Sequence, residues 1–306
     1  MNEDSSSSPP FFIVGSARSG TTWLRIILNA HSQVAVPPES RFIVSLWEGR
    51  DDVDAAALLS RLGSHKRFQE WRLPLEEVER ALPEYPTYAQ VMAAAHVAYA
   101  RVRGKPRWGD KTPRYVDHIP LLARLFPDAL FIHQIRDGRD VALSYADVPF
   151  GPKSVAAAAE LWSSRVRAGM AAGRALGPER YIEVRYEALV TEPERHTRAL
   201  CEFLGLSFEP EMLDSERAKE AILPRAALYN PNVARGAKAK PRSWEDDMPS
   251  AQVEVFEAIA GDLLTELGYP RRFEVPRPRA RLAAAAARRG LPIGRLRRAK
   301  PPQVEA

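Results

Sequence analysis

The residues with the clearest chemical meaning lie between Gly15 and Thr22, in a turn rich in glycine, serine and threonine. Apolar residues 11–14 before this turn predict a short buried strand, and the residues after Gly20 predict a helix that starts at Thr21. Backbone N–H groups at a helix start have no partner within the helix, so this turn can hold an anion. The glycine spacing is that of the phosphate-binding loop G-x-x-x-x-G-K-[ST].

One position departs from that loop, because Thr21 stands where the motif carries lysine. The lysine reaches the β- and γ-phosphates of a nucleoside triphosphate, so its loss argues against ATP or GTP chemistry but leaves the phosphate cradle intact. Arg18, inside the loop, supplies a cation instead. Taken alone, the segment also fits a strand, turn and helix that bind no ligand.

A second strand, turn and helix start is predicted at residues 129–145. Arg136 follows its apolar strand, and Ser144 lies two turns into its helix. Ligands of open α/β sheets bind outside the carboxyl ends of the strands, so we expect the two units to deliver two anion sites to one edge of the sheet. A salt bridge from Arg136 to Asp137 or Asp140 is the alternative for this arginine.

Taken together, the two segments resemble the sulfotransferases that use 3′-phosphoadenosine 5′-phosphosulfate (PAPS). In that family a loop like A-R-S-G-T-T-W binds the 5′-phosphosulfate, and a strand-end arginine followed eight residues later by serine binds the 3′-phosphate. The resemblance covers about residues 11–206. The cofactor contacts that it implies in the two segments are Arg18, Ser19, Gly20, Thr21, Thr22, Arg136 and Ser144.

Finer motifs resemble the branch with the tyrosylprotein sulfotransferases and many bacterial members, more than the cytosolic phenol and steroid enzymes. These motifs are R-S-G-T-T at 18–22, L-N-A-H at 28–31, P-E-S-R at 38–41, G-D-K-T-P at 109–113 and V-R-Y-E-A-L at 184–189. The resemblance implies an α/β fold like that of P-loop NTPases, a three-layer sandwich with a central parallel sheet and a helical insertion. Alternating strands and helices along the chain favour the same architecture.

Sulfuryl transfer, like phosphoryl transfer, is an in-line displacement that needs a base for the acceptor hydroxyl and cations for the leaving phosphate. The resemblance places the catalytic glutamate at Glu39, just after a short strand predicted at residues 34–36. At the carboxyl end of that strand, the side chain is expected to face the crevice beside the phosphate loop. A simple ion pair with Arg41 is the alternative for Glu39.

Lys111 is the second catalytic candidate, expected to neutralise charge on the bridging oxygen together with Arg18. Its alternative is an exposed lysine paired with Asp110. Histidine serves as the base in the cytosolic branch, which makes His118 and His133 the competing candidates. His133 falls in the middle of a predicted strand and His118 on a predicted helix, so Glu39 is preferred to both.

The remaining cofactor contacts come from the resemblance. Tyr186 resembles a tyrosine near the nucleotide, and residues 230–244 resemble the loop that closes over the adenosine and the 3′-phosphate. Arg235 is the predicted contact in this loop, with Lys238 and Lys240 as open alternatives. The sequence has no Cys/His cluster, EF-hand loop or acidic Walker-B strand, so no metal is expected.

The length of 306 residues favours one domain, predicted at residues 11–270 after a disordered N-terminus at 1–10. Residues 40–105 predict a helical insertion, the candidate acceptor pocket and lid. Core packing is the alternative for its aromatic residues, which are Phe42, Trp47, Phe68, Trp71, Tyr85 and Tyr88. Further predicted elements are helices 53–62, 75–82, 88–103, 153–176 and 193–204 and a strand at 181–184.

The net charge of +5 comes from the C-terminal tail, residues 271–306, which holds 11 Lys/Arg and 2 acidic residues, whereas residues 1–270 have 33 and 37. Contact with an acidic surface or membrane is one use of such a tail, but a solvated, partly disordered tail around a short helix at 279–289 is preferred. A single cysteine, Cys201, and the lack of a signal peptide or long apolar run predict a cytoplasmic protein.

We therefore expect an enzyme that transfers a sulfuryl group from PAPS to a hydroxyl of a glycan, glycolipid or secondary metabolite, with no nucleic-acid partner. The alternatives are a P-loop kinase and a non-catalytic protein that binds adenosine phosphates. A pure binder needs neither Glu39 nor Lys111, which favours the enzyme. The sequence identifies neither the acceptor nor the oligomeric state.

Overall fold

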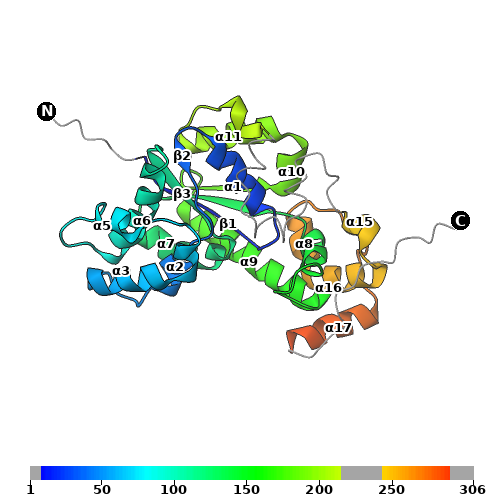
Figure 1. The fold of residues 1–306 in the computed structure, drawn as a ribbon. Coiled ribbons are helices and arrows are strands. Elements are labelled where there is room, and N and C mark those ends of the chain that lie inside the picture. The colour runs from blue at the N-terminus through cyan, green and yellow to red at the C-terminus, as the bar shows by residue number, and fades with distance from the viewer. Residues whose placement is uncertain (1–7, 215–242, 290–306) are drawn as a thin grey trace, which may run out of the picture.

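Five parallel strands form the centre of the computed structural model, which describes residues 8–214 and 243–289 (Figure 1). The strands lie in the order β2-β3-β1-β4-β5, and every neighbouring pair is parallel. They are β1 (Phe11–Gly15), β2 (Val34–Ala35), β3 (Arg107–Lys111), β4 (Leu130–Ile135) and β5 (Tyr181–Arg185). The predicted α/β fold with a parallel sheet is confirmed.

Side chains alternate across β1 and reach two separate cores, as expected for a strand buried on both faces. Phe11 and Ile13 pack with the apolar faces of α1 (Thr21–Ala30) and α11 (Pro193–Leu204). Phe12 and Val14 face the opposite side, which is covered by α6 (Tyr88–Arg101) and α9 (Val155–Leu176). Figure 1 shows α1 and α11 on one side of the sheet and α9 on the other. The carboxyl ends of β1 and β4 meet at one edge because these strands are direct neighbours.

Between β2 and β3 the chain is helical, as the insertion was expected to be. Its helices are α2 (Phe42–Ser45), α3 (Ala55–Ser64), α4 (Lys66–Gln69), α5 (Leu75–Glu79) and α6. The aromatic side chains at positions 42, 68, 71 and 88 are buried in one cluster, and Trp47 packs against Tyr88 with ring centroids 4.8 Å apart. Tyr85, in contrast, is 85% exposed. The core alternative thus accounts for most of these aromatic residues.

The other helices follow β3, β4 and β5. They are the 3₁₀ helix η1 (Pro113–His118), α7 (Ile119–Leu125), α8 (Gly138–Tyr145), α10 (Tyr186–Thr191), the 3₁₀ helix η2 (Pro210–Leu213), α15 (Trp244–Asp247), α16 (Ser250–Glu266) and α17 (Pro278–Arg288). In residues 8–214 and 243–289, none of the helices combines the length and apolar character that a membrane span requires.

Residues 271–286 are largely exposed but contact the domain at several points, and the short helix predicted at 279–289 is present as α17. Backbone N–H groups of Arg272 and Phe273 donate to Glu257 on α16 at 3.0 and 2.7 Å. Arg277 forms a bidentate ion pair with Glu254, and the buried Ala284 lies on α17, which contacts α16. The many arginines of this segment predicted a solvated tail, because nothing in the local sequence indicates its contacts with α16.

Candidate active site

The phosphate loop connects β1 to α1 and leaves the helix N-terminus open. Gly20 is the N-cap residue with φ +87°, and no side chain caps this helix. The first turn also holds no acidic residue. Uncapped N–H groups and the helix dipole both favour an anion at this position. The structure therefore keeps the anion cradle that the glycine spacing predicted.

Tyr186, the first residue of α10, brings the phosphate loop and Arg136 together. A Cβ atom added to Gly20 would lie 2.3 Å from Cδ2 of Tyr186 and 3.2 Å from Nε2 of Gln134. On the other side, the Arg136 guanidinium lies 4.5 Å from the centroid of the Tyr186 ring. One aromatic ring thus contacts both segments that the sequence assigned to the nucleotide.

Arg18 and Ser144 form a second link between the two segments. Arg18 donates from Nε to the Ser144 hydroxyl at 2.9 Å. Arg18 has φ +75°, a left-handed conformation that is uncommon for residues other than glycine. The resemblance assigned these side chains to opposite ends of the cofactor, and the structure shows that they are in direct contact.

Several buried polar atoms around the loop have no hydrogen-bond partner among the described residues. They are Oγ of Ser19, Oε1 and Nε2 of Gln134 and Nε of Arg136. Each such group costs about 1–3 kcal/mol unless a ligand or water satisfies it. Their position beside the cradle is what a bound polar ligand would explain. Gln134 is not among the predicted contacts, and its only signal in the sequence is a polar side chain near the end of an apolar strand.

The start of α8 is not a second open helix terminus. The Asp137 side chain caps α8 by accepting from the Arg139 N–H at 2.9 Å, and Asp140 lies in the first turn. The N-terminus of α8 is therefore not open to an anion in the way that the N-terminus of α1 is. The predicted anion contacts in this unit, Arg136 and Ser144, depend on side chains and stay predictions. Arg136 also pairs with Asp140, Nη2 to Oδ2, at 3.6 Å.

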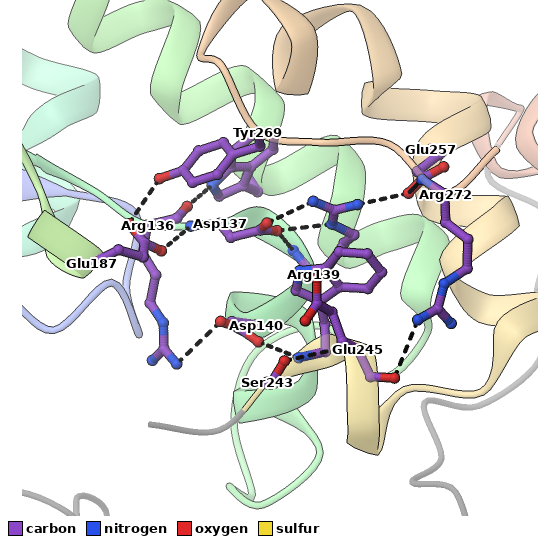
Figure 2. Close-up of polar contacts among 12 residues, drawn as sticks. Arg136, Asp137, Arg139, Asp140, Glu187, Ser243, Glu245, Glu257, Tyr269 and Arg272 are labelled. Carbon is purple, nitrogen blue, oxygen red and sulfur yellow. Dashed lines mark hydrogen bonds and ion pairs between the residues drawn. The ribbon is translucent and has the colours of Figure 1, made fainter. Parts of the chain in front are cut away.

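A buried ion-pair network fixes α8 to the C-terminal helices (Figure 2). The fully buried Arg139 lies between Asp137 and Glu257, with an N···O distance of 2.7 Å to each. Glu187 accepts from the Asp137 N–H at 2.8 Å and from the Tyr269 hydroxyl at 3.0 Å. The network holds the backbone next to Arg136 in place.

Glu39 and Lys111 meet at the carboxyl ends of β2 and β3. Nζ of Lys111 donates to Oε1 of Glu39 at 3.1 Å, and Arg41 donates to the other oxygen at 2.9 Å. The Lys111 side chain is 6% exposed and the Glu39 side chain 25%. Asp110 instead pairs with His96 at 3.0 Å. The alternative of an exposed Lys111 paired with Asp110 is wrong, whereas the alternative pairing of Glu39 with Arg41 is present beside the Lys111 contact.

Burial and charge act in opposite directions on this pair. Burial by itself would raise the pKa of Glu39, but Lys111 and Arg41 outweigh it and lower the pKa to about 2. Burial lowers the pKa of Lys111, and Glu39 offsets part of this effect. Glu39 is thus a carboxylate at any physiological pH. The strength of its interaction with Lys111 determines how readily it accepts a proton.

The two competing histidines have different surroundings. His133 is buried in the middle of β4, where Nδ1 lies 2.5 Å from the Tyr181 hydroxyl and burial lowers its pKa to about 3. His118 ends η1 and is half-buried. Arg235, Lys238 and Lys240 lie outside the described residues. Within those that are described, no three His, Cys, Asp or Glu side chains form a group able to hold a metal ion.

Gly20→Ala is expected to weaken binding of 3′-phosphoadenosine 5′-phosphate (PAP) at least about tenfold, because the new methyl group displaces the Tyr186 ring or shifts the loop. Gly49→Ala is the matched control, since Gly49 has φ +86° and open space around the added Cβ. Both variants place alanine in a left-handed backbone conformation, so both carry that strain. Calorimetry of PAP binding and thermal unfolding of the two variants therefore separate the backbone strain from the clash with Tyr186. Equal PAP affinities in the two variants would show that the Gly20–Tyr186 contact does not shape the site.

Comparison with known proteins agrees with this geometry. A family model described as "Sulfotransferase family" matches residues 9–210. Protein-tyrosine sulfotransferase A of Caenorhabditis elegans is 25% identical over 270 residues, which are 86% of this chain and 67% of that protein. Nodulation protein NoeE of Sinorhizobium fredii is 27% identical over 304 residues, 90% of this chain and 69% of that protein.

Solved structures show the same fold. The sulfotransferase domain of the Synechococcus PCC 7002 olefin synthase matches with a TM-score of 0.58 and 22% identity, covering 88% of this chain and 98% of that domain. Mouse sulfotransferase SULT7A1, solved in complex with PAP, matches with a TM-score of 0.51 and 14% identity, covering 85% of this chain and 86% of that protein. Because the family model matches residues 9–210, the chain belongs to the sulfotransferase family and is a sulfotransferase enzyme.

Proposed function

We propose that this enzyme transfers the sulfuryl group of PAPS to a hydroxyl of an acceptor, either a glycan, a glycolipid or a secondary metabolite. The observation that carries the proposal is the convergence of three groups at one sheet edge. They are the uncapped phosphate loop, whose Arg18 contacts Ser144, the strand-end Arg136, and the Glu39–Lys111 ion pair. The similarity to a protein-tyrosine sulfotransferase supports the same reaction class. The similarity to a sulfotransferase solved in complex with PAP is consistent with it.

The residues present fit a nucleotide with phosphate groups at both ends. The open N-terminus of α1 suits the 5′-phosphosulfate. Arg136 suits the 3′-phosphate, since its Nε has no partner among the described residues and its guanidinium lies over Tyr186. An arginine fork matches a phosphate in both shape and charge. The acceptor enters on the side of Glu39, whose carboxylate is partly exposed.

PAPS supplies an activated sulfuryl group with a phosphate as its leaving group. Glu39 accepts the proton of the acceptor hydroxyl on a carboxylate oxygen. Lys111 fixes that carboxylate at 3.1 Å and, with Arg18, opposes the negative charge that builds up on the bridging oxygen. Because Lys111 is almost fully buried, its charge acts in a medium of lower dielectric constant than water.

The test compares PAP with AMP, which lacks the 3′-phosphate. A charge-assisted contact to Arg136 is worth about 1.5–3 kcal/mol, so PAP is expected to bind at least about tenfold more tightly than AMP. Arg136→Ala should remove most of this difference, while Arg50→Ala, at an exposed arginine, should keep it. Equal calorimetric affinities of the wild-type protein for PAP and AMP would contradict the donor assignment.

A further inference from the structure

Arg136 already has a carboxyl partner in the protein itself. Oδ2 of Asp140 lies 3.6 Å from Nη2 of Arg136, one helical turn away, and both side chains are 11% exposed. The other carboxylate oxygen, Oδ1, accepts the backbone N–H of Trp244 at 2.7 Å. Figure 2 shows Asp140 between Arg136 and the start of α15. The Asp140 carboxyl group thus lies next to the guanidinium that the proposed function assigns to the 3′-phosphate.

The surroundings of Asp140 disfavour its negative charge. Asp137 at the start of α8 and Glu187 on α10 add negative potential, and Tyr186 contributes a neutral phenol from the same helix. Arg136 and the Trp244 N–H favour the charged form. Burial has the largest effect and raises the pKa of Asp140 to about 7, against the pull of Arg136. Asp140 can therefore gain or lose a proton near neutral pH.

We propose that Asp140 is a specificity-determining residue for the 3′ position of the nucleotide, whose carboxylate competes with the 3′-phosphate for Arg136. The inference rests on the proposed function, since it assumes that Arg136 contacts this phosphate. Two negative groups at one guanidinium repel each other, so binding of the 3′-phosphate favours protonation of Asp140 at Oδ2. The neutral carboxyl group keeps its contact with the Trp244 N–H through Oδ1 and no longer opposes the phosphate.

The protonation of Asp140 determines how PAP affinity changes with pH. Above its pKa, Asp140 is charged and must take up a proton or tolerate repulsion when PAP binds, so PAP affinity falls as pH rises. Below that pKa, the carboxyl group is neutral and the competition disappears. A nucleotide with a 3′-hydroxyl brings no charge to Arg136, so its affinity stays independent of Asp140.

Calorimetry with PAP and AMP tests the inference on the wild-type protein, Asp140→Asn and the control Asp262→Asn, an exposed aspartate on α16. At about pH 8.5, Asp140→Asn should bind PAP about tenfold more tightly than the wild type, with AMP unchanged. At about pH 6 the PAP affinities of the two proteins should agree within roughly twofold. Asp262→Asn should match the wild type at both pH values. The comparison between proteins cancels the ionisation of the ligand itself.

A second measurement needs no variant. PAP binding to the wild-type protein at about pH 7.5, in two buffers of different ionisation enthalpy, should take up more protons than AMP binding. Weaker PAP binding by Asp140→Asn, or equal effects on PAP and AMP, would overturn the role of Asp140 while leaving the PAPS assignment intact. Equal wild-type affinities for PAP and AMP would overturn the proposed function itself, and this inference with it.

Discussion

Glu39→Gln is expected to lower kcat by roughly a hundredfold to ten-thousandfold, the usual contribution of a general base. The amide keeps the size of the carboxylate, and its single oxygen can still accept from either Lys111 or Arg41, which contact Oε1 and Oε2 of the wild-type carboxylate. It cannot accept the proton of the acceptor hydroxyl. PAP affinity should stay within about threefold of the wild type, because the proposed nucleotide contacts include Arg18 and Arg136 and not Glu39.

Steady-state kinetics and PAP calorimetry on the same preparation check this result. Glu84→Gln, at an exposed glutamate of the insertion, is the matched control and should change neither quantity. If Glu39→Gln keeps near-normal turnover while His118→Ala is inactive, the base is the histidine, and the assignment of Glu39 is wrong.

Lys111→Ala is expected to lower kcat by roughly a hundredfold to a thousandfold, since it removes a buried cation from the developing charge. It should also change the pH profile. Lys111 is the leading cause of the low pKa of Glu39, about 2 in the wild-type protein. Without Lys111, only Arg41 opposes the effect of burial, and the Glu39 pKa rises.

A base is active only in its deprotonated form, so activity falls as pH drops through its pKa. The wild-type profile of kcat/KM should therefore show no acidic limb from Glu39 above about pH 4, whereas the Lys111→Ala profile should acquire one. Lys66→Ala, at an exposed lysine, is the control. Identical acidic sides of the Lys111→Ala and wild-type profiles would show that Lys111 does not set the ionisation of Glu39.

Local sequence signals predicted the elements that carry the site. The helix expected to start at Thr21 does so as α1, and the helix expected at 193–204 has the same bounds in the structure, as α11. The sequence next to each helix contains a boundary signal: Gly20 precedes α1, and Gly205 follows α11. The four-residue helices α2 and α4 were missed, because one turn is too short to show a helical period.

The missed parts of the site depend on contacts between distant segments. Asp140 and Trp244 are 104 positions apart, and only the packing of α15 against α8 brings them together. Likewise, burial of Arg139 between Asp137 and Glu257 follows from the position of α16. A charged residue at the start of a helix is predicted to be exposed to solvent, because the local sequence does not show which distant residues cover it.

Transfer of label from PAPS to an acceptor tests the central claim most directly. The wild-type protein, supplied with PAPS labelled in its sulfuryl group and a metabolite extract, should produce a labelled product by mass spectrometry and an equal amount of PAP. Glu39→Gln should form this product at least about a hundredfold more slowly. Products that carry no label from PAPS, or label transfer that Glu39→Gln leaves unchanged, would contradict the account.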